Sequence, residues 1–449
     1  MALGYHDLML TSPTLTLGRV FKTWWPLALS WLLMGLEVPA VSAVVARLIE
    51  PKVNLAAFGG VVFPLALLIE SPIVMLLAAS TALSKDRAAY LKIRRFMLWV
   101  SAALTLIHSA IVFTPLYGVV VGSLIDAPPE VVGPARVGLA IMIPWTWGIA
   151  YRRFNQGVLI RFGHSRAVGT GTLVRLAADA AVLAIGYAVG SIPGIVVAAV
   201  AMNAGVFSEA FYVKRRVAPV LRDQLPDSAP GASWLGLRAF LAFYIPLSLT
   251  SVIALFASPL GSAALSRMPN ALDSLALWPV VTGVSFVFRS FGFAYNEVVV
   301  ALLGEQGSFG ALRRFAFLGA AATSVGLAAL LVPPVGDFWF RDVIGLPDGL
   351  ADVARSSLWF ALPLPALSML QSWLQGMVVH TRRTRLITEA VALSLFSMSC
   401  VLVAGVLGGG VLGLYVGVAA LTVGDSLRTG LLAWRGRGVW RSLSEGAGS

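Results

Sequence analysis

The sequence predicts an all-α polytopic membrane protein with about twelve transmembrane helices in two pseudo-symmetric six-helix bundles. Its composition and an internal repeat predict this fold class. Of the 449 residues, 58% are hydrophobic and only 12% are charged, and the mean hydropathy is +0.85. A soluble domain carries about 25% charged residues. Apolar runs of roughly 20 residues, each long enough to cross the hydrocarbon core of a bilayer, recur along the whole chain.

The internal repeat relates two halves of the chain. In its first block, Pro26, Pro39, Ser42, Ala43 and Arg47 return 220 positions later as Pro246, Pro259, Ser262, Ala263 and Arg267. In its second block, Arg136, Pro144, Gln156-Gly157 and Arg166 return 219 positions later as Arg355, Pro363, Gln375-Gly376 and Arg385. Two similar halves are a common plan of secondary transporters, which bind substrate between their repeats.

The repeat and the apolar runs together predict the domain organisation. We expect an N-terminal six-helix bundle in 1–213, a cytoplasmic linker in 214–235, a C-terminal six-helix bundle in 236–432 and a basic cytoplasmic tail in 433–449. The expected spans of the first bundle are 24–46, 53–83, 96–121, 137–161, 168–190 and 192–213. Those of the second bundle are 236–266, 271–303, 315–333, 356–380, 386–407 and 410–432.

The basic residues indicate the orientation of these spans. Lys and Arg concentrate in the two terminal segments and in alternate loops. The other loops hold only Arg47, Lys52, Arg136, Arg267, Arg341 and Arg355. This bias predicts a multi-pass protein of the plasma membrane, or of the inner membrane in a bacterium, with both termini cytoplasmic. The net charge of +12 therefore reflects topology and not a nucleic-acid partner. We expect a monomer.

Three arginines and a glutamate at membrane depth are the expected substrate-binding residues. A charge near the bilayer centre costs at least about 2.5–3.5 kcal/mol, so it requires a partner or an aqueous cavity. Glu70 aligns in the repeat with Ser290, next to Arg289, which favours an arrangement in which Glu70 and Arg289 face each other across the cleft. The substrate-binding prediction comprises Arg289, Arg152, Arg153 and Glu70. With Arg175, the arginines would form a basic belt that attracts anionic cargo.

A second set of residues is expected to couple or gate transport. This set comprises Glu37, Asp179, Arg175 and Glu297. Glu37 is the hardest of them to explain as structural, because it lies deep in the first span.

Structural alternatives remain open for several of these residues. Arg152 and Arg153 would snorkel to the headgroups if their span ended earlier. Arg289 and Glu70 would form a static ion pair that locks the inner gate. Asp179 would neutralise Arg175, four residues away on the same helical face.

Other polar and breaking residues have simpler expected roles. Glu209, Glu389 and Asp425 lie near predicted span ends, where interfacial solvation suffices. Cys400 lies in an apolar run and is expected to be a small buried side chain. Frequent prolines, together with the unusual length of the second and eighth spans, predict kinked helices that face a central cavity.

Enzyme signatures are absent from the sequence. There is no Walker loop, no GxGxxG after a strand, no HExxH and no GxSxG. We therefore expect no enzymatic activity and no bound cofactor. Active transport would be driven by an ion gradient, with a proton or sodium as the coupling ion, or by exchange.

Two stretches resemble a known superfamily. Gln156-Gly157 through Arg166, and its repeat Gln375-Gly376 through Arg385, look like the multidrug/oligosaccharidyl-lipid/polysaccharide exporter superfamily. Its multidrug extrusion (MATE) members have two parallel six-helix bundles.

A closer resemblance is to the progressive ankylosis (ANK) family. It rests on Trp24-Trp25-Pro26-Leu27-Ala28-Leu29 with its repeat at Pro246, on Ser258-Pro259 and Ser266-Arg267, and on Ser71-Pro72 with Ser84-Lys85-Asp86-Arg87. The resemblance implies export of small anions such as pyrophosphate, nucleotides or citrate.

The first functional hypothesis is an alternating-access exporter of small organic or phosphate-containing anions. The alternatives are a MATE-type cation-coupled multidrug antiporter, and a lipid-linked flippase or non-transporting scaffold. The observation that discriminates between anion and cation transport is whether arginines or carboxylates line the central cavity.

Overall fold

The protein is helical throughout the part that the computed structural model describes, residues 15–228, 236–381, 385–438 and 440, and this part contains no β-strand. We call 15–228 the N-half and 236–440 the C-half. The N-half contains α1 (Leu17–Gly35), α2 (Glu37–Val45), α3 (Pro51–Leu55), η1 (Ala56–Val62), α4 (Phe63–Glu70), η2 (Ser71–Ile73), α5 (Leu76–Leu83), α6 (Arg87–Phe113), η3 (Gly118–Leu124), α7 (Pro129–Met142), α8 (Trp145–Arg161), α9 (Arg166–Val189) and α10 (Gly194–Asp223). The C-half contains α11 (Leu237–Ser266), α12 (Ala271–Phe293), α13 (Tyr295–Leu302), α14 (Ser308–Ala329), α15 (Pro333–Asp337), η4 (Phe338–Val343), α16 (Asp348–Ala361), α17 (Leu364–His380), α18 (Arg385–Gly408) and α19 (Gly413–Arg435).

The helices confirm the all-α polytopic fold class. In the described residues, ten helices are long and apolar enough to cross a membrane, or eleven if α14 and the bent α15–η4 segment form one span. The predicted fourth span corresponds to α7 and α8 and does not meet the same test. Its α8 part is too polar, because it carries Arg152, Arg153, Asn155, Gln156 and Arg161. The expected number of about twelve is therefore one or two higher than length and hydropathy alone support.

The predicted linker and tail lie only partly within the described residues. Residues 214–223, expected in the linker, are the last turns of α10. Residues 229–235 of the linker, and 439 and 441–449 of the tail, lie outside the described residues.

The repeat recurs in the backbone. The helices α16, α17, α18 and α19 each begin 219 positions after α7, α8, α9 and α10. The left-handed residues Glu50 and Asn270 are repeat mates, as are Asp126 and Gly345.

A matching hydrogen bond fixes the last helix of each half. Asn54 Oδ1 accepts from the backbone N–H of Ile195 at 3.0 Å. Its repeat mate Ser274 accepts through Oγ from the backbone N–H of Leu414 at 3.2 Å. Both bonds satisfy an N–H in the first turn of a helix, where no intrahelical carbonyl is available. The two halves therefore share internal geometry as well as sequence.

Helix breaks occur where the prolines predict them. The predicted second span runs through π-helical η1 and a 3₁₀ turn, η2, that contains Pro72. Pro144 and Pro363, which are repeat mates, stand at the breaks before α8 and α17. The prediction of kinked helices is confirmed.

The first helix of each half packs against the other half. In α1, Trp24 donates from Nε1 to the backbone oxygen of Phe291 at 2.9 Å, and Arg19 donates from Nη2 to Glu305 Oε1 at 2.8 Å. In α11, the Tyr244 hydroxyl donates to the backbone oxygen of Pro72 at 2.6 Å. The chain returns to its own half at the break between α1 and α2, so these exchanged helices tie the two halves together.

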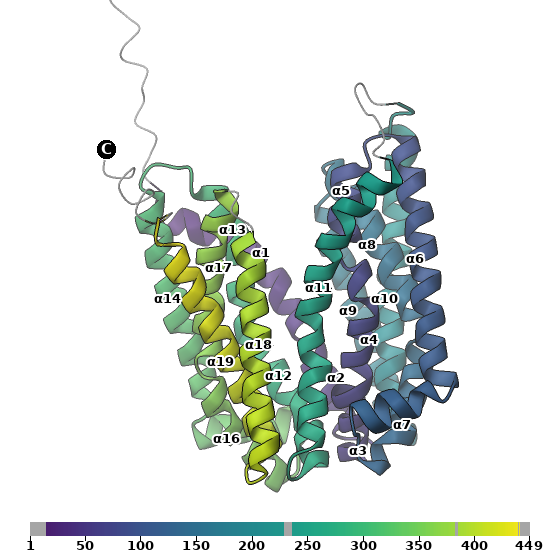
Figure 1. Ribbon diagram of the computed structural model, residues 1–449, viewed down its shortest axis with the longest axis vertical. Coiled ribbons are helices and arrows are strands. Elements are labelled where there is room, and N and C mark those ends of the chain that lie inside the picture. The colour runs from purple at the N-terminus through teal and green to yellow at the C-terminus, as the bar shows by residue number, and fades with distance from the viewer. Residues whose placement is uncertain (1–14, 229–235, 382–384, 439, 441–449) are drawn as a thin grey trace, which may run out of the picture.

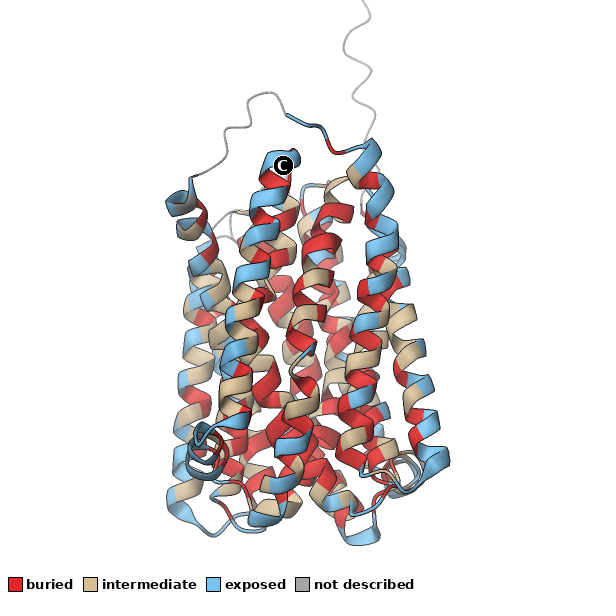
Figure 2. Ribbon diagram, turned by 90° about the vertical axis from the view of Figure 1, so that its right-hand side faces the viewer, coloured by how far each residue is buried: buried red, intermediate tan, exposed pale blue. Residues whose placement is uncertain are grey.

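The halves form two arms that diverge toward the end where the chain terminates (Figure 1). We call this the open end, which the charge distribution predicts to be cytoplasmic, and the opposite end the closed end. Buried residues gather on the central helices and toward the closed end, and exposed residues cover the outer faces (Figure 2). The most apolar stretches of α10 and α12–α13 are 61% buried, whereas those of α9 and α11 are 17% buried. The outer helices therefore present apolar side chains to lipid.

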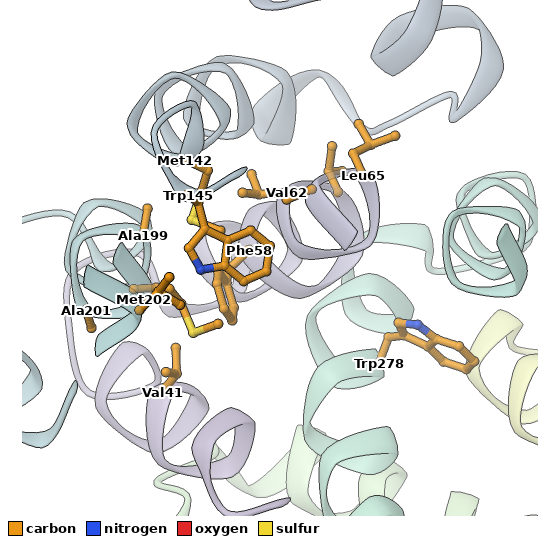
Figure 3. Close-up of a cluster of buried hydrophobic side chains, with 14 of the residues drawn as sticks. Val41, Phe58, Val62, Leu65, Met142, Trp145, Ala199, Ala201, Met202 and Trp278 are labelled. Atoms are coloured by element: carbon orange, nitrogen blue, oxygen red, sulfur yellow. The ribbon is translucent and has the colours of Figure 1, made fainter. Parts of the chain in front are cut away.

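The core of the N-half centres on aromatic rings. Figure 3 shows Phe58 and Trp145 packed near Met202 and Val41, with Trp278 of α12 set apart. By contrast, Cys400 is exposed on α18, so its expected burial was wrong. Exposure on an outer helix places this thiol on the lipid-facing surface.

Repeat mates touch each other where the halves meet. A Cβ atom at Gly59 of η1 would lie 2.1 Å from Cγ of Pro279, its mate 220 positions on. Two mates can be in contact only near the pseudo-symmetry axis. The axis therefore passes through this contact, which requires a glycine.

Gly59→Ala is expected to lower the apparent Tm by a few degrees in detergent. The added methyl group must displace Pro279, and overpacking of this kind costs about 1–3 kcal/mol. Gly133→Ala is the control, since a Cβ there meets nothing within 4 Å. Equal Tm values for the two variants would contradict the close packing of the halves.

Candidate functional site

Arg152 lies in a buried ion pair inside the N-half. Its Nη1 donates to Glu209 Oε2 at 2.6 Å, and the other carboxylate oxygen accepts from Gln156 Nε2 at 2.8 Å. Glu209 is fully buried on α10. This bond joins α8 to α10 and neutralises one arginine of the predicted belt.

The expectation that Glu209 is solvated at a membrane interface was wrong. The predicted span ended at 213, but α10 continues to Asp223. Glu209 is therefore about 22 Å from the start of a 30-residue helix. Arg152 was the sequence signal that could have indicated the role of Glu209, because a buried arginine requires a counter-charge on a neighbouring helix.

Arg175 holds Glu37 through two hydrogen bonds. Its Nε donates to Glu37 Oε1 at 3.0 Å, and its Nη2 donates to Oε2. Leu36 separates α1 from α2, so Glu37 is the first residue of α2 and faces α9. Asp179, one turn further along α9, lies 3.9 Å from Arg175 Nε. The structure thus brings together three of the four predicted coupling residues.

Asp179 is confined by a glycine on the next helix. A Cβ atom at Gly205 would lie 1.9 Å from Asp179 Oδ1, so only glycine leaves space for this carboxylate. Both Asp179 oxygens lack a hydrogen-bond partner among the described residues. An unsatisfied buried carboxylate beside the Arg175–Glu37 pair provides a second acceptor to which Arg175 can turn.

Glu70 is buried at the end of α4, where the helix changes to η2. Its Oε2 has no hydrogen-bond partner in the described residues. The charges that act on it most strongly are those of Arg152, Arg153 and Arg175, together with Glu37, all in the N-half. Glu70 therefore belongs to the N-half network.

Arg289 does not pair with Glu70. Its Nη2 donates to Asp425 Oδ2 at 2.6 Å, between α12 and α19 of the C-half. Gln371, the repeat mate of Arg152, donates to the backbone oxygen of Asp425 and to Thr429 Oγ1, both at 3.0 Å. The predicted Glu70–Arg289 arrangement across the cleft was wrong, because Arg289 binds a carboxylate of its own half. The expectation that Asp425 is solvated at a span end was also wrong, because Asp425 is buried and binds Arg289.

The other two predicted residues, Arg153 and Glu297, do not take part in these ion pairs. Arg153 is half-buried next to Arg152 and forms no ion pair within the described residues. Glu297 is exposed in the first turn of α13 and also forms no ion pair with residues that the structure describes.

A central cavity of about 290 Å³ separates the halves. Its walls come from α1, α2, η1 and α4 on one side and from α11 and α12 on the other. Phe63, Trp278 and Phe286 make it aromatic, and Ser258 and Thr282 contribute hydroxyls. Glu37 is the one titratable side chain among its lining residues. A carboxylate in an aromatic, apolar cavity favours a cationic or amphiphilic ligand.

Glu37 also lines a second hollow. This hollow, of about 440 Å³, lies between α2 and α9 and includes Asp179 and Tyr187. Glu37 therefore stands in the wall between the central cavity and the Asp179 side of the network.

The closed end is held by the duplicated arginines. Arg47 donates from Nη1 to the backbone oxygen of Ile344 at 2.8 Å, and from Nη2 to that of Asp342. Arg267 donates from Nη2 to the backbone oxygen of Ser123 at 2.8 Å. Each guanidinium thus reaches carbonyls at the end of a π-helical segment, η4 or η3, in the opposite half. We call these reciprocal bonds the arginine clasp.

Comparisons with known proteins place the fold. The chain resembles the inward-facing conformation of a multidrug resistance MATE family transporter of the MOP superfamily, with a TM-score of 0.69, 16% identity, and coverage of 94% of this chain and 99% of that one. The outward-facing conformation of a multidrug resistance MATE family transporter of the MOP superfamily gives 0.60, 16% identity, and coverage of 96% and 97%. Lipid II flippase MurJ, in its inward closed conformation, gives 0.68, 12% identity, and coverage of 94% and 90%.

Sequence comparisons found nothing. No family model matches the chain, and no curated protein matches it. The resemblance to the ANK family therefore stays a prediction.

Removal of Glu209 is expected to destabilise the protein strongly. Glu209→Ala leaves Arg152 buried without a counter-charge, at a cost on the order of 3–5 kcal/mol. The double variant Arg152→Met with Glu209→Leu is expected to unfold at a higher temperature than Glu209→Ala. The measurement is the apparent Tm in detergent.

Asp223→Ala is the matched control, because it breaks the exposed Arg222–Asp223 pair. Its Tm is expected to equal that of the wild type. A Glu209→Ala variant as stable as this control would show that the pair is not a structural anchor.

The comparisons and the helices together establish that this chain has the fold of MATE transporters and of MurJ, a multi-pass helical membrane fold.

Proposed function

We propose that this protein is a gradient-driven, alternating-access exporter of amphiphilic organic cations. The observation that carries the proposal is the central cavity, in which Glu37 is the one titratable lining residue and the walls are aromatic or apolar. The arginines of the expected basic belt do not line it. Arg152 and Arg289 instead bind Glu209 and Asp425.

Arg175 gives this cavity a means of exchange. The Glu37 carboxylate binds the Arg175 guanidinium, which also lies beside Asp179. A cation that enters the cavity, or a proton, competes with Arg175 for Glu37. When Glu37 is taken, Arg175 keeps a counter-charge by turning toward Asp179. Substrate and coupling proton would then exclude each other at one carboxylate, as an antiporter requires.

The divergence of the arms supports an inward-open state. The higher TM-score to the inward-facing MATE conformation than to an outward-facing one supports the same state. Transport would then require the arginine clasp to open and the open end to close. The exchanged helices α1 and α11, which cross between the halves, are the elements that would bend.

Export of small anions is the second candidate function. Arg153 favours it, since this half-buried arginine forms no ion pair within the described residues. The ANK resemblance implies the same substrates. This candidate predicts that citrate or pyrophosphate uptake into proteoliposomes depends on Arg153.

Glu37→Gln is expected to reduce proton-driven ethidium transport in proteoliposomes by roughly tenfold or more. The amide removes the charge that binds the cation, and a charge-assisted contact is worth about 1.5–3 kcal/mol. Glu130→Gln removes an exposed carboxylate in the first turn of α7 and is expected to keep transport within about twofold of the wild type. Each variant is first matched to the wild type in apparent Tm.

Two outcomes would overturn the cation proposal. One is ethidium transport that is equal in Glu37→Gln and wild type. The other is citrate or pyrophosphate transport that is lost in Arg153→Gln while ethidium is not transported at all.

A further inference from the structure

A pocket of about 810 Å³ lies in the C-half at the open end. It is formed by α14, α17 and α19, which share one arm (Figure 1), by Leu17 at the start of α1 and by Trp440. Its apolar wall consists of Phe317, Leu318, Leu370 and Leu374. It shares no residue with the central cavity or with the Glu37 network.

Two adjacent arginines stand at this pocket. Arg313 and Arg314 are exposed in the second turn of α14, and neither forms an ion pair with described residues. The Arg313 guanidinium lies 6.0 Å from the ring centre of Phe309. The pair offers positive charge next to an apolar wall, at the level that the charge distribution assigns to the cytoplasmic headgroups.

Trp373 lines the pocket and carries a polar group, its indole N–H. Only 4% of this residue is exposed, and its ring packs against Trp440 at 5.6 Å between centres. Its Nε1–H has no hydrogen-bond partner among the described residues. A buried donor without an acceptor is costly, so an oxygen of a bound ligand would satisfy it.

Comparison with the repeat mates shows which features of this pocket the membrane topology explains. Arg313 and Arg314 are the mates of Arg94 and Arg95 on α6, so the positive-inside bias accounts for a basic pair in both halves. The mate of Trp373 is Phe154, which has no N–H. The unsatisfied Trp373 donor therefore has no counterpart at the equivalent position of the N-half, and Trp440 Nε1 at the same pocket also lacks a partner among the described residues.

We propose that this pocket binds one anionic phospholipid of the cytoplasmic leaflet. The phosphate lies between the two arginines, and an ester or phosphate oxygen accepts from Trp373 Nε1. The acyl chains follow the apolar wall. Basic pockets between helices on this side of a membrane are suited to anionic headgroups. The proposal depends on the membrane fold and not on the transported substrate.

The test is native mass spectrometry of the intact protein in detergent, titrated with phosphatidylglycerol or phosphatidylcholine. The wild type is expected to bind one phosphatidylglycerol roughly tenfold or more tightly than phosphatidylcholine. Arg313→Gln with Arg314→Gln is expected to remove this preference. Trp373→Phe, which keeps the ring and deletes the donor, is expected to weaken phosphatidylglycerol binding several-fold.

Arg94→Gln with Arg95→Gln is the matched control and is expected to retain the site. An equal loss in this control would reduce the effect to non-specific charge attraction and overturn the proposal. Equal affinity for phosphatidylcholine would do the same, since the pocket would then hold only annular lipid. Displacement of the lipid by inorganic phosphate at similar concentration would assign the site to a free anion instead.

Discussion

The contact between the halves at the closed end is the constraint on which the rest of the structure depends. The pseudo-symmetry axis passes through Gly59 and Pro279, and the arginine clasp spans it reciprocally. Because each clasp arginine donates to backbone carbonyls at a helix end, the contact uses geometry that both halves share. Only with this end closed can the arms diverge elsewhere. The proposed transport cycle requires a second arrangement, in which this end opens and the other end closes.

Ion pairs that stay within one half make such motion feasible. Arg152 binds Glu209 in one half, and Arg289 binds Asp425 in the other. An ion pair across the cleft would have to break, at the cost of exposing buried charge, each time the arms moved. Glu37 is different, because it lies in the wall of the cavity and pairs with Arg175 on an outer helix. This is the charged contact that a ligand can reach.

Much of the fold could be predicted from sequence, because repetition and hydropathy are local signals. The offset of 219 or 220 positions identified the matching segments of the two halves, with Pro144 and Pro363 and the duplicated arginines at equivalent positions, although α7 begins at Pro129 and not at the predicted 137. Pairing partners could not be predicted in the same way. The acceptor of Arg289 lies 136 positions away on α19, and only packing brings it near. The grouping of Glu37 with Arg175 and Asp179 likewise depends on how α2 crosses to α9.

Alternating access requires that the two arms move as rigid bodies, so that one end of the molecule closes when the other opens. Double electron–electron resonance tests this motion directly, in a Cys400→Ser background. One pair of spin labels, on Lys85→Cys and Gly304→Cys, reports the open-end distance. A second pair, on Glu130→Cys and Gly349→Cys, reports the closed-end distance. All four labelled positions are exposed, and a Cβ at either glycine meets nothing within 4 Å. When both clasp arginines are replaced by alanine, the open-end distance is expected to shorten while the closed-end distance lengthens. If neither distance changed, the arms would be a rigid scaffold, and the alternating-access mechanism would be contradicted.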